Sequence, residues 1–544
     1  MSDRETLIIN YWLDNCQTNH PECVSDQAAF MPTRVVDIGL EENQQPRLVL
    51  TADLNSTDRR YLALSHCWGS TMPPAATTNL STIPNRLQEI PIAGLSRTFA
   101  DFIGIARKLR VQYVWIDSLC IIQDSKEDWE SEAAQMASVY SNAYCTIAAS
   151  SSVDGNGGCR TDPDCKPYGP VRLTFNEGDE KGGNILQIVQ VFSVFGLSLR
   201  LANANVLIQD PLSKRGWTFQ ERELSTRMLH YSDDTIRWEC QSLKASLEFP
   251  WQDTNAFNRV LRTFDSRQIT SRQVSSPPYR QPPLTQKRKD QEAWFEAVDR
   301  YTKRALTKQS DKLPALSGIA RAVQAHTGDR YLAGLWESNL ISCLLWYSTW
   351  HPAGDNPVFD PSKPAPIFHA RQTEYTAPSW SWAAINGHVR YETWIFNALD
   401  PDPITGPNAR FIPQILGAEI IPAGKDEYGQ LEGGLVRLRG KMKPAFTKGE
   451  GFVRQDREGI YDVHERQMRE VGMIKYDVPT DSPVGQTRVI ICLCLMPRAE
   501  RFGDSVGLAI VPTGRKDEYR RVGLFLAVRL EWWEGCAEGV ISLV

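Results

Sequence analysis

Apolar and polar positions in the first half of the chain follow two periods, one typical of buried strands and one typical of helices. Short apolar runs at 61–64, 111–116 and 144–149 predict buried strands. Residues 95–109 carry apolar side chains at three- and four-residue spacing, and so does the stretch after Ser125, which predicts two amphipathic helices. Strands and helices in this order predict an α/β domain with a parallel sheet flanked by helices.

Further strands and a short helix are predicted before and after these elements along the chain. Residues 215–222 predict a short helix, and the runs after it alternate as the two strands of a hairpin do. Upstream of residue 61, two runs have the apolar, β-branched character of strands. The additional strands predicted in this way cover 34–40, 47–54, 229–231 and 235–239.

The pattern changes after residue 240, which predicts more than one domain in 544 residues. A polar, Pro-rich stretch predicts a linker, helical spacing follows it, and short alternating runs then predict a β-rich sandwich or partly closed barrel. The predicted parts are an N-terminal segment at 1–59, the α/β domain at 60–240, a linker at 241–290, a helical region at 291–374 and a β-rich domain at 375–544.

Polar side chains that can carry chemistry follow two of the predicted strands. His66, Cys67 and Trp68 come directly after one strand, and Asp117 and Cys120 come after another. Ligands of open α/β sheets bind at the carboxyl ends of strands, so these side chains are expected at one site. A thiol beside an imidazole is also the combination that activates a cysteine nucleophile.

The predicted short helix adds Arg215, Trp217 and Glu221 to the candidate residues. An alternative interpretation makes Arg215 and Glu221 a structural clamp between helix and sheet. The side chains expected to carry the chemistry are His66, Asp117, Cys120 and Glu221. Those expected to contact a substrate are Cys67, Trp68, Trp115, Gln123, Glu132, Arg215 and Trp217.

Composition narrows the class of protein. A net charge of −5 gives no support for nucleic-acid binding. The amino terminus lacks a signal-peptide pattern, and no apolar run reaches the roughly 20 residues of a membrane span. Twelve cysteines without a secretory signal are expected to remain thiols in a cytoplasmic protein. Sixteen tryptophans predict large cores or an aromatic-lined cavity.

Cys16, His20 and Cys23 have the spacing of half a zinc site. No second cluster follows at the spacing of a zinc finger, so we expect a short helix packed by two buried thiols rather than a metal site. The chain also lacks the phosphate-binding loop, the dinucleotide fingerprint and the zinc-protease and serine-hydrolase motifs. An active site must therefore be assembled from residues scattered along the chain.

Three blocks of the sequence resemble the signature blocks of the fungal heterokaryon incompatibility (HET) domain. They are YLALSHCWG, the long block from SRTFADF to VYSNA, and RGWTFQERELSTRMLHY. The blocks occur in the order that the family shows. Later stretches such as APSWSWA and YRRVGLF are similar to full-length HET proteins. The sequence departs from the family at Ile122, where Asn is usual, and at Glu132, where Gln is frequent.

The resemblance implies a filamentous fungus and a role in non-self recognition and programmed cell death. The HET domain has been likened to the TIR fold, whose members can cleave NAD with a Glu in the site, and this likeness is an analogy between folds. It implies NAD as a substrate rather than a bound cofactor, with Glu221 or Glu132 as the carboxylate and Trp68 or Trp115 stacked on a ring.

Two other functions are left open by the sequence. One is a small-molecule enzyme recruited to secondary metabolism, in which Cys120 or Cys67 attacks with His66 as base and Asp117 as its partner. The other is a non-catalytic signalling scaffold, in which these polar groups only join strand ends to helix starts. A small molecule or nucleotide is the expected partner in the first two cases, and a homo-oligomer is compatible with all three.

Overall fold

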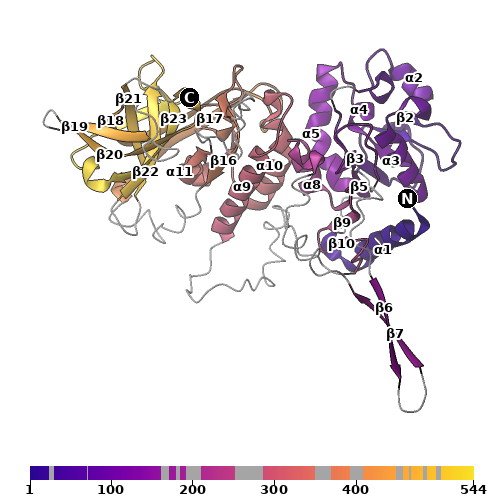
Figure 1. The fold of residues 1–544 in the computed structure, drawn as a ribbon. Coiled ribbons are helices and arrows are strands. Elements are labelled where there is room, and N and C mark those ends of the chain that lie inside the picture. The colour runs from indigo at the N-terminus through magenta and orange to yellow at the C-terminus, as the bar shows by residue number, and fades with distance from the viewer. Residues whose placement is uncertain are drawn as a thin grey trace, which may run out of the picture. The chain divides into compact units, whose positions relative to one another are not determined.

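Two units, Met1–Arg262 and Thr263–Val544, make up the chain. The computed structural model is drawn in Figure 1. It describes residues 1–23, 30–69, 72–160, 171–178, 184–191, 210–251, 286–349, 369–391, 409–448, 458–464, 467–481, 487–497 and 504–544. Much of the predicted linker at 241–290, namely residues 252–285, therefore lies outside the described residues.

A mixed sheet forms the centre of the first unit. From one edge to the other its strands are β10 (Lys244–Ser246), β9 (Ile236–Cys240), β8 (Arg227–Tyr231), β5 (Cys145–Ala148), β3 (Tyr61–Ser65), β4 (Tyr113–Trp115), β1 (Arg34–Asp37) and β2 (Arg47–Leu50). The central strands β8, β5, β3 and β4 are parallel, as predicted.

Both edges of this sheet are antiparallel, so the sheet as a whole is mixed and the predicted parallel arrangement holds for its central strands. Strand β1 pairs antiparallel with β2 and β4, and β9 pairs antiparallel with β8 and β10. Short connections join β1 to β2 and β8 to β9, and only antiparallel neighbours can be joined so directly. The predicted hairpin at 229–239 is confirmed by β8 and β9.

Helices lie around this sheet (Figure 1). They are α1 (Asp3–Asn19), α2 (Ile83–Gln88), α3 (Arg97–Lys108), α4 (Asp117–Cys120), α5 (Lys126–Asn142) and α8 (Thr218–Leu224). The side chains of Ser96 and Ser125 accept hydrogen bonds from the backbone N–H of Phe99 and Asp128. These caps satisfy N–H groups that a helix start leaves free, so α3 and α5 begin where the sequence predicts.

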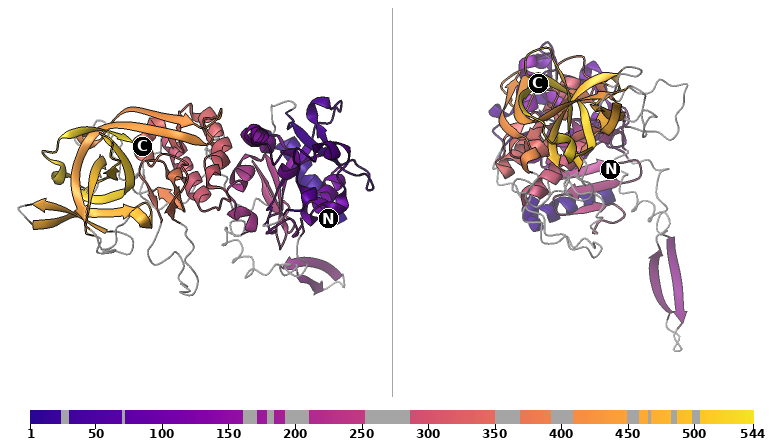
Figure 2. Two further views of the ribbon diagram at one scale, coloured as in Figure 1. Left: turned by 90° about the horizontal axis from the view of Figure 1, so that it is seen from above. Right: turned by 90° about the vertical axis from the view of Figure 1, so that its left-hand side faces the viewer.

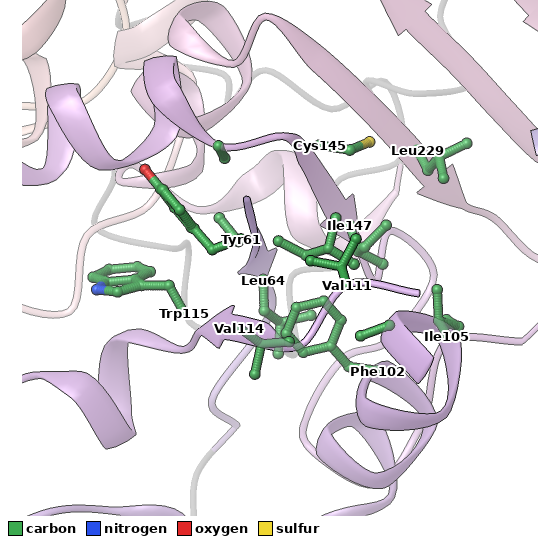
Figure 3. Packing of buried hydrophobic residues seen from close by; sticks show 14 of the residues in the cluster. Tyr61, Leu64, Phe102, Ile105, Val111, Val114, Trp115, Cys145, Ile147 and Leu229 are labelled. Atoms are coloured by element: carbon green, nitrogen blue, oxygen red, sulfur yellow. The ribbon is translucent and has the colours of Figure 1, made fainter. Parts of the chain in front are cut away.

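The core of the first unit lies between the sheet and its helices. Figure 3 shows Leu64, Val114 and Ile147 of the central strands packed with Phe102 of α3. All four side chains are at most 1% exposed. Burial of each such side chain contributes about 1.5–3 kcal/mol, which fixes the strand ends where the polar residues follow. Strands β6 (Val171–Gly178) and β7 (Asn184–Val191) form a separate antiparallel hairpin.

Helices precede a β-rich part in the second unit, in the order that the sequence predicts. The helices are α9 (Gln286–Thr302), α10 (Pro314–Thr327) and α11 (Leu340–Cys343). Short strands accompany them: β11 (Tyr331–Leu332), β12 (Leu335–Trp336), β13 (Trp346–Ser348), β14 (Ala370–Arg371), β15 (Ile385–Asn386) and β16 (Val389–Tyr391). None of the helices in the described part of the chain is both long and apolar enough to cross a membrane.

The β-rich part is a curved sheet whose pairings close into a ring (Figure 2). Its strands are β17 (Gln414–Pro422), β18 (Leu431–Thr447), β19 (Glu458–His464), β20 (Gln467–Tyr476), β21 (Arg488–Pro497), β22 (Asp504–Pro512), β23 (Glu518–Arg529) and β24 (Glu538–Leu543). The ring runs through β18, β19, β20, β23, β22 and β21, because β18 pairs with both β19 and β21. The sequence predicted either a sandwich or a partly closed barrel, and the ring of pairings corresponds to the barrel.

Candidate active site

Three chain segments meet beyond the carboxyl ends of the central strands. His66 follows β3, and Asp117 begins α4 just after β4. Because β3 and β4 are parallel neighbours with Ala63 beside Trp115, the residues that follow them lie at the same edge of the sheet. Helix α8 adds Glu221 to this edge, where its carboxylate accepts a hydrogen bond from Ser65 at the end of β3.

Asp117 is the member of this cluster that reaches the surface, with 21% of its side chain exposed. Its Oδ2 accepts a hydrogen bond of 2.8 Å from Trp68 Nε1, and its Oδ1 accepts one of 2.7 Å from the backbone N–H of Ser118. The same Oδ1 lies 3.8 Å from His66 Nδ1. Asp117 therefore fixes the indole of Trp68 and faces the imidazole at the same time.

His66 is buried and faces Asp117 with one nitrogen only. Its Nε2 has no hydrogen-bond partner among the described residues, and its ring packs edge-on against Phe99. Burial lowers the pKa of His66 to about 4, although Asp117 opposes this and Arg215 adds to it. The imidazole is therefore neutral at pH 7, with a nitrogen available to accept a proton if Asp117 holds the proton on Nδ1.

Glu221 is a buried carboxylate whose neighbours come from all three segments. Its Oε2 lies 2.5 Å from Ser65 Oγ, which donates to it. Burial is the largest cause that raises the pKa of Glu221 to about 7, and the charge of Asp117 raises it further. Hydrogen bonds from Ser65 and Tyr140 and the charge of Arg215 act in the opposite direction. Both protonation states of Glu221 are thus populated at neutral pH.

Arg215 ties α8 and its preceding turn to β3. One guanidinium nitrogen donates a hydrogen bond of 2.5 Å to the backbone carbonyl of His66. Its positive charge also acts on Glu221 and Cys67 through their pKa values. This geometry agrees with the clamp that the sequence left open, and it also places a cation beside the carboxylates.

The two cysteines predicted as nucleophiles are sealed in the interior. Cys120 is 1% exposed within the core, and burial raises the pKa of its thiol to about 12. Cys67 is 4% exposed and packs against Ala148, Leu212 and Met228, and burial raises its pKa as well. Both thiols are protonated at neutral pH, so the geometry does not favour covalent catalysis by cysteine.

Trp115 is buried in the core, and Trp217 is partly buried against it. Trp115 is fully buried beside Tyr140, which leaves no face of its indole for a ligand ring. Trp217 packs edge-on against Trp129 of α5, with ring centroids 6.3 Å apart. Of the tryptophans near the strand ends, Trp68 is the one that Asp117 orients at the edge of the cluster.

Gln123 and Glu132 serve the surroundings of the site. The amide of Gln123 donates to the backbone carbonyls of Asp117 and Ile121, which holds the loop after α4. Glu132 lies 3.6 Å from Arg34 of β1 and is 3% exposed. It therefore joins α5 to the sheet, away from the Ser65–Glu221 contact.

Two residues of the cluster were not among the predicted site residues. Ser65 stands next to His66 in the sequence, so the strand-end position was the signal that could have identified it. Tyr140 was assigned only to the apolar face of a helix, but its hydroxyl donates to the carbonyl of Leu64 and lies near enough to Glu221 to lower the pKa of that carboxyl. No local pattern reveals that contact, because α5 and α8 are far apart along the chain.

A hollow of about 320 Å³ lies at the opposite end of the strands, where they begin. Arg60, Tyr144 and Arg227, which line it, stand at the amino-terminal starts of β3, β5 and β8. It is therefore separate from the cluster of Asp117 and Glu221. In the described part of the chain, the side chains close enough to share a metal ion are those of Cys16, His20, Cys23 and Cys240, and they do not belong to the cluster either.

The fold and the cluster define an α/β domain with two neighbouring carboxylates at the ends of parallel strands. Residues 61–221 match the family model described as heterokaryon incompatibility protein (HET), so the chain carries a HET domain. The match contains all the predicted site residues, and it confirms the resemblance drawn from the three sequence blocks. Neither a curated protein nor a solved structure matches the chain.

Proposed function

We propose that this protein is an effector of the heterokaryon-incompatibility type whose HET domain cleaves NAD, or a related nucleotide, at the bond between nicotinamide and ribose. In this hydrolysis the C1′–N1 bond breaks and its electron pair stays on the nicotinamide ring. Water supplies the new hydroxyl at C1′, and its proton passes to a base. The observation that carries the proposal is that Glu221 and Asp117 lie at the same ends of the central strands, where the charge of Asp117 acts on the pKa of Glu221.

Glu221 has the properties that this reaction needs from a carboxylate. Cleavage of a glycosidic bond builds positive charge on the sugar, and an ionised carboxylate stabilises that charge. A pKa of about 7 allows the same group to be ionised for this purpose or to carry a proton at neutral pH. Ionisation of a buried carboxylate costs stability, so its presence here is better explained by chemistry than by folding.

The proposal also needs a surface for the nicotinamide ring and a base for the proton of water. Trp68, which Asp117 orients, and His66 are the candidates for these two functions. Trp68, held through its Nε1, offers an indole at the partly exposed edge of the cluster, where a nicotinamide ring could stack. His66 is neutral, and its buried Nε2 has no hydrogen-bond partner among the described residues, so it is a candidate for the base that accepts the proton of a water that enters the site. The analogy to TIR proteins rests on the parallel central strands alone.

The test is incubation of the purified full-length protein with NAD, with release of nicotinamide followed by liquid chromatography. We expect Glu221→Gln and Asp117→Asn each to lower the rate by about 10²–10⁴-fold, the usual contribution of an acid or base group. Glu130→Gln is the matched control, because Glu130 is 52% exposed on α5. Failure of the wild-type protein to release nicotinamide, both dilute and self-associated, would remove the proposal.

A non-catalytic signalling domain is the second candidate. It is favoured by the burial of Glu221 and by the position of the 320 Å³ hollow at the other end of the strands. In that case Glu221→Gln would leave the cell-death response of an expressing fungal cell intact. Loss of that response together with nicotinamide release would instead favour catalysis.

A further inference from the structure

The fold completes the half zinc site that the sequence shows near the amino terminus. Cys16 and His20 lie one helical turn apart at the end of α1, and Cys23 ends the turn after it. The missing fourth group is Cys240, at the end of strand β9. The three sulfur atoms and one imidazole nitrogen all lie within 4.8 Å of one another.

We propose that Cys16, His20, Cys23 and Cys240 bind a structural zinc ion that fastens the amino-terminal helix to the HET domain. Three cysteines and one histidine are a common ligand set for structural zinc. Bond lengths of about 2.3 Å to sulfur and 2.0–2.1 Å to nitrogen place tetrahedral ligand atoms about 3.5–3.8 Å apart. The sulfur of Cys240 and Nδ1 of His20 are 3.4 Å apart, so small shifts of the other thiols complete the tetrahedron.

Burial favours a structural rather than a catalytic ion. Cys16, Cys23 and Cys240 are at most 1% exposed, and the partly exposed His20 closes the cluster toward solvent. Four protein ligands leave no open position for water or substrate. The site would therefore contribute to folding rather than to chemistry.

Donors around the sulfur atoms are arranged for thiolates. Arg227 Nε donates to Cys16 Sγ at 3.2 Å, and the backbone N–H of Leu243 donates to Cys240 Sγ at the same distance. Such outer-shell donors orient metal ligands and stabilise their charge. Three thiolates with Zn²⁺ leave one net negative charge, which the guanidinium of Arg227 offsets. Nδ2 of Asn15 lies 3.4 Å from Nε2 of His20. With Nδ1 on the metal, Nε2 carries the hydrogen, so the amide would have to turn and present its oxygen as the acceptor.

The residues around the cluster join the same two segments, which explains what a metal would stabilise. Trp12 of α1 stacks on Trp238 of β9 with ring centroids 6.0 Å apart, and its Nε1 donates to the carbonyl of Pro250. Glu22 accepts a hydrogen bond from Ser242, next to the cluster. A zinc ion here would cross-link α1 to strand β9, which lies far from it along the chain, and loss of the ion would free both.

Metal analysis and cobalt spectroscopy of the full-length protein test the site. Protein purified without chelators is expected to hold one zinc per chain. After the zinc is removed, Co²⁺ should give the visible absorption of a tetrahedral site and thiolate-to-metal charge transfer. Chelation should lower the midpoint of thermal unfolding, because the ion binds the folded state. These readouts need no NAD, so they are independent of the proposed hydrolysis.

Variants separate the site from other thiols. Cys240→Ala and His20→Ala should weaken zinc binding by more than the roughly 10–100-fold that loss of an outer-shell partner costs. Cys159→Ala, which removes a buried thiol outside the cluster, should keep one zinc per chain. Should Cys240→Ala fail to fold, the zinc content of His20→Ala and the cobalt spectrum of the wild type decide whether these residues bind the metal. Absence of the thiolate–cobalt spectrum, unchanged zinc in His20→Ala, or a disulfide among the three cysteines would overturn the proposal.

Discussion

Glu221→Gln is expected to raise the free energy of unfolding by up to about 3 kcal/mol at pH 8 and to leave it nearly unchanged at pH 4. The folded protein raises the pKa of Glu221 to about 7, chiefly by burial, whereas the pKa of a free Glu is about 4.3. The folded state therefore prefers the protonated carboxyl. This preference stabilises the fold fully below about pH 4.3 and is lost as the pH rises through about 7.

A neutral amide removes that loss, so the stability of the variant should vary less between pH 4 and pH 8. Unfolding by urea at several pH values measures the difference, with the exposed Glu130→Gln as control. The prediction is contradicted if the two proteins differ equally at all pH values, because Glu221 would then not titrate in this range. A variant that is more stable and yet inactive would indicate that the carboxylate is kept for its chemistry.

The second large effect is expected in the second unit, where Arg521→Leu should lower the free energy of unfolding by about 3–5 kcal/mol. Arg521 of β23 is fully buried, and its Nε lies 3.0 Å from Oδ2 of Asp477. Its other nitrogens donate to the carbonyls of Leu344 and Trp346, and its guanidinium lies 3.4 Å from the ring centroid of Trp346. Removal of the cation leaves two carbonyls without their donor, and it leaves the buried Asp477 to the more distant Arg371, whose nitrogen lies 3.5 Å away.

Arg515→Leu is the control, since Arg515 is 83% exposed and such changes stay within about 0.5 kcal/mol. Arg521→Lys should recover only part of the loss, because an ammonium cannot make the same forked contacts. Urea unfolding followed by tryptophan fluorescence measures all three variants. An Arg521→Leu protein that loses less than about 1 kcal/mol would mean that the ion pair contributes little to this unit.

Local pattern was enough to predict most elements of the HET domain. Ser96 and Ser125 cap α3 and α5 close to where the helical spacing begins, because capping depends on residues within one helical turn. The runs at 61–64 and 111–116 became parallel neighbours, because a strand–helix–strand order leaves few other arrangements. The antiparallel hairpin of β8 and β9 was also predicted, from the alternation in its two strands. The antiparallel pairing of β1 with β4 was missed, since the pairing partner of a strand is not encoded in that strand.

The same distinction holds for the functional groups. Position after a strand identified His66 and Asp117, and the structure places the two side chains together. Exposure could not be predicted in this way: Cys120 and Trp115 follow or end the same strand but point into the core. Contacts between distant segments were also beyond the pattern, as with Tyr140 beside Glu221 and Cys240 beside Cys16.

The convergence of the segments at 66, 117 and 221 is tested most directly by the titration of Glu221 with and without the charge of Asp117. Stability differences between proteins with and without Glu221→Gln, measured across pH, give the pKa of Glu221, and the series is repeated in the presence of Asp117→Asn. Asp117 raises that pKa in the native protein, so Asp117→Asn should shift the titration to lower pH. An unchanged titration would contradict a shared carboxylate centre at the strand ends.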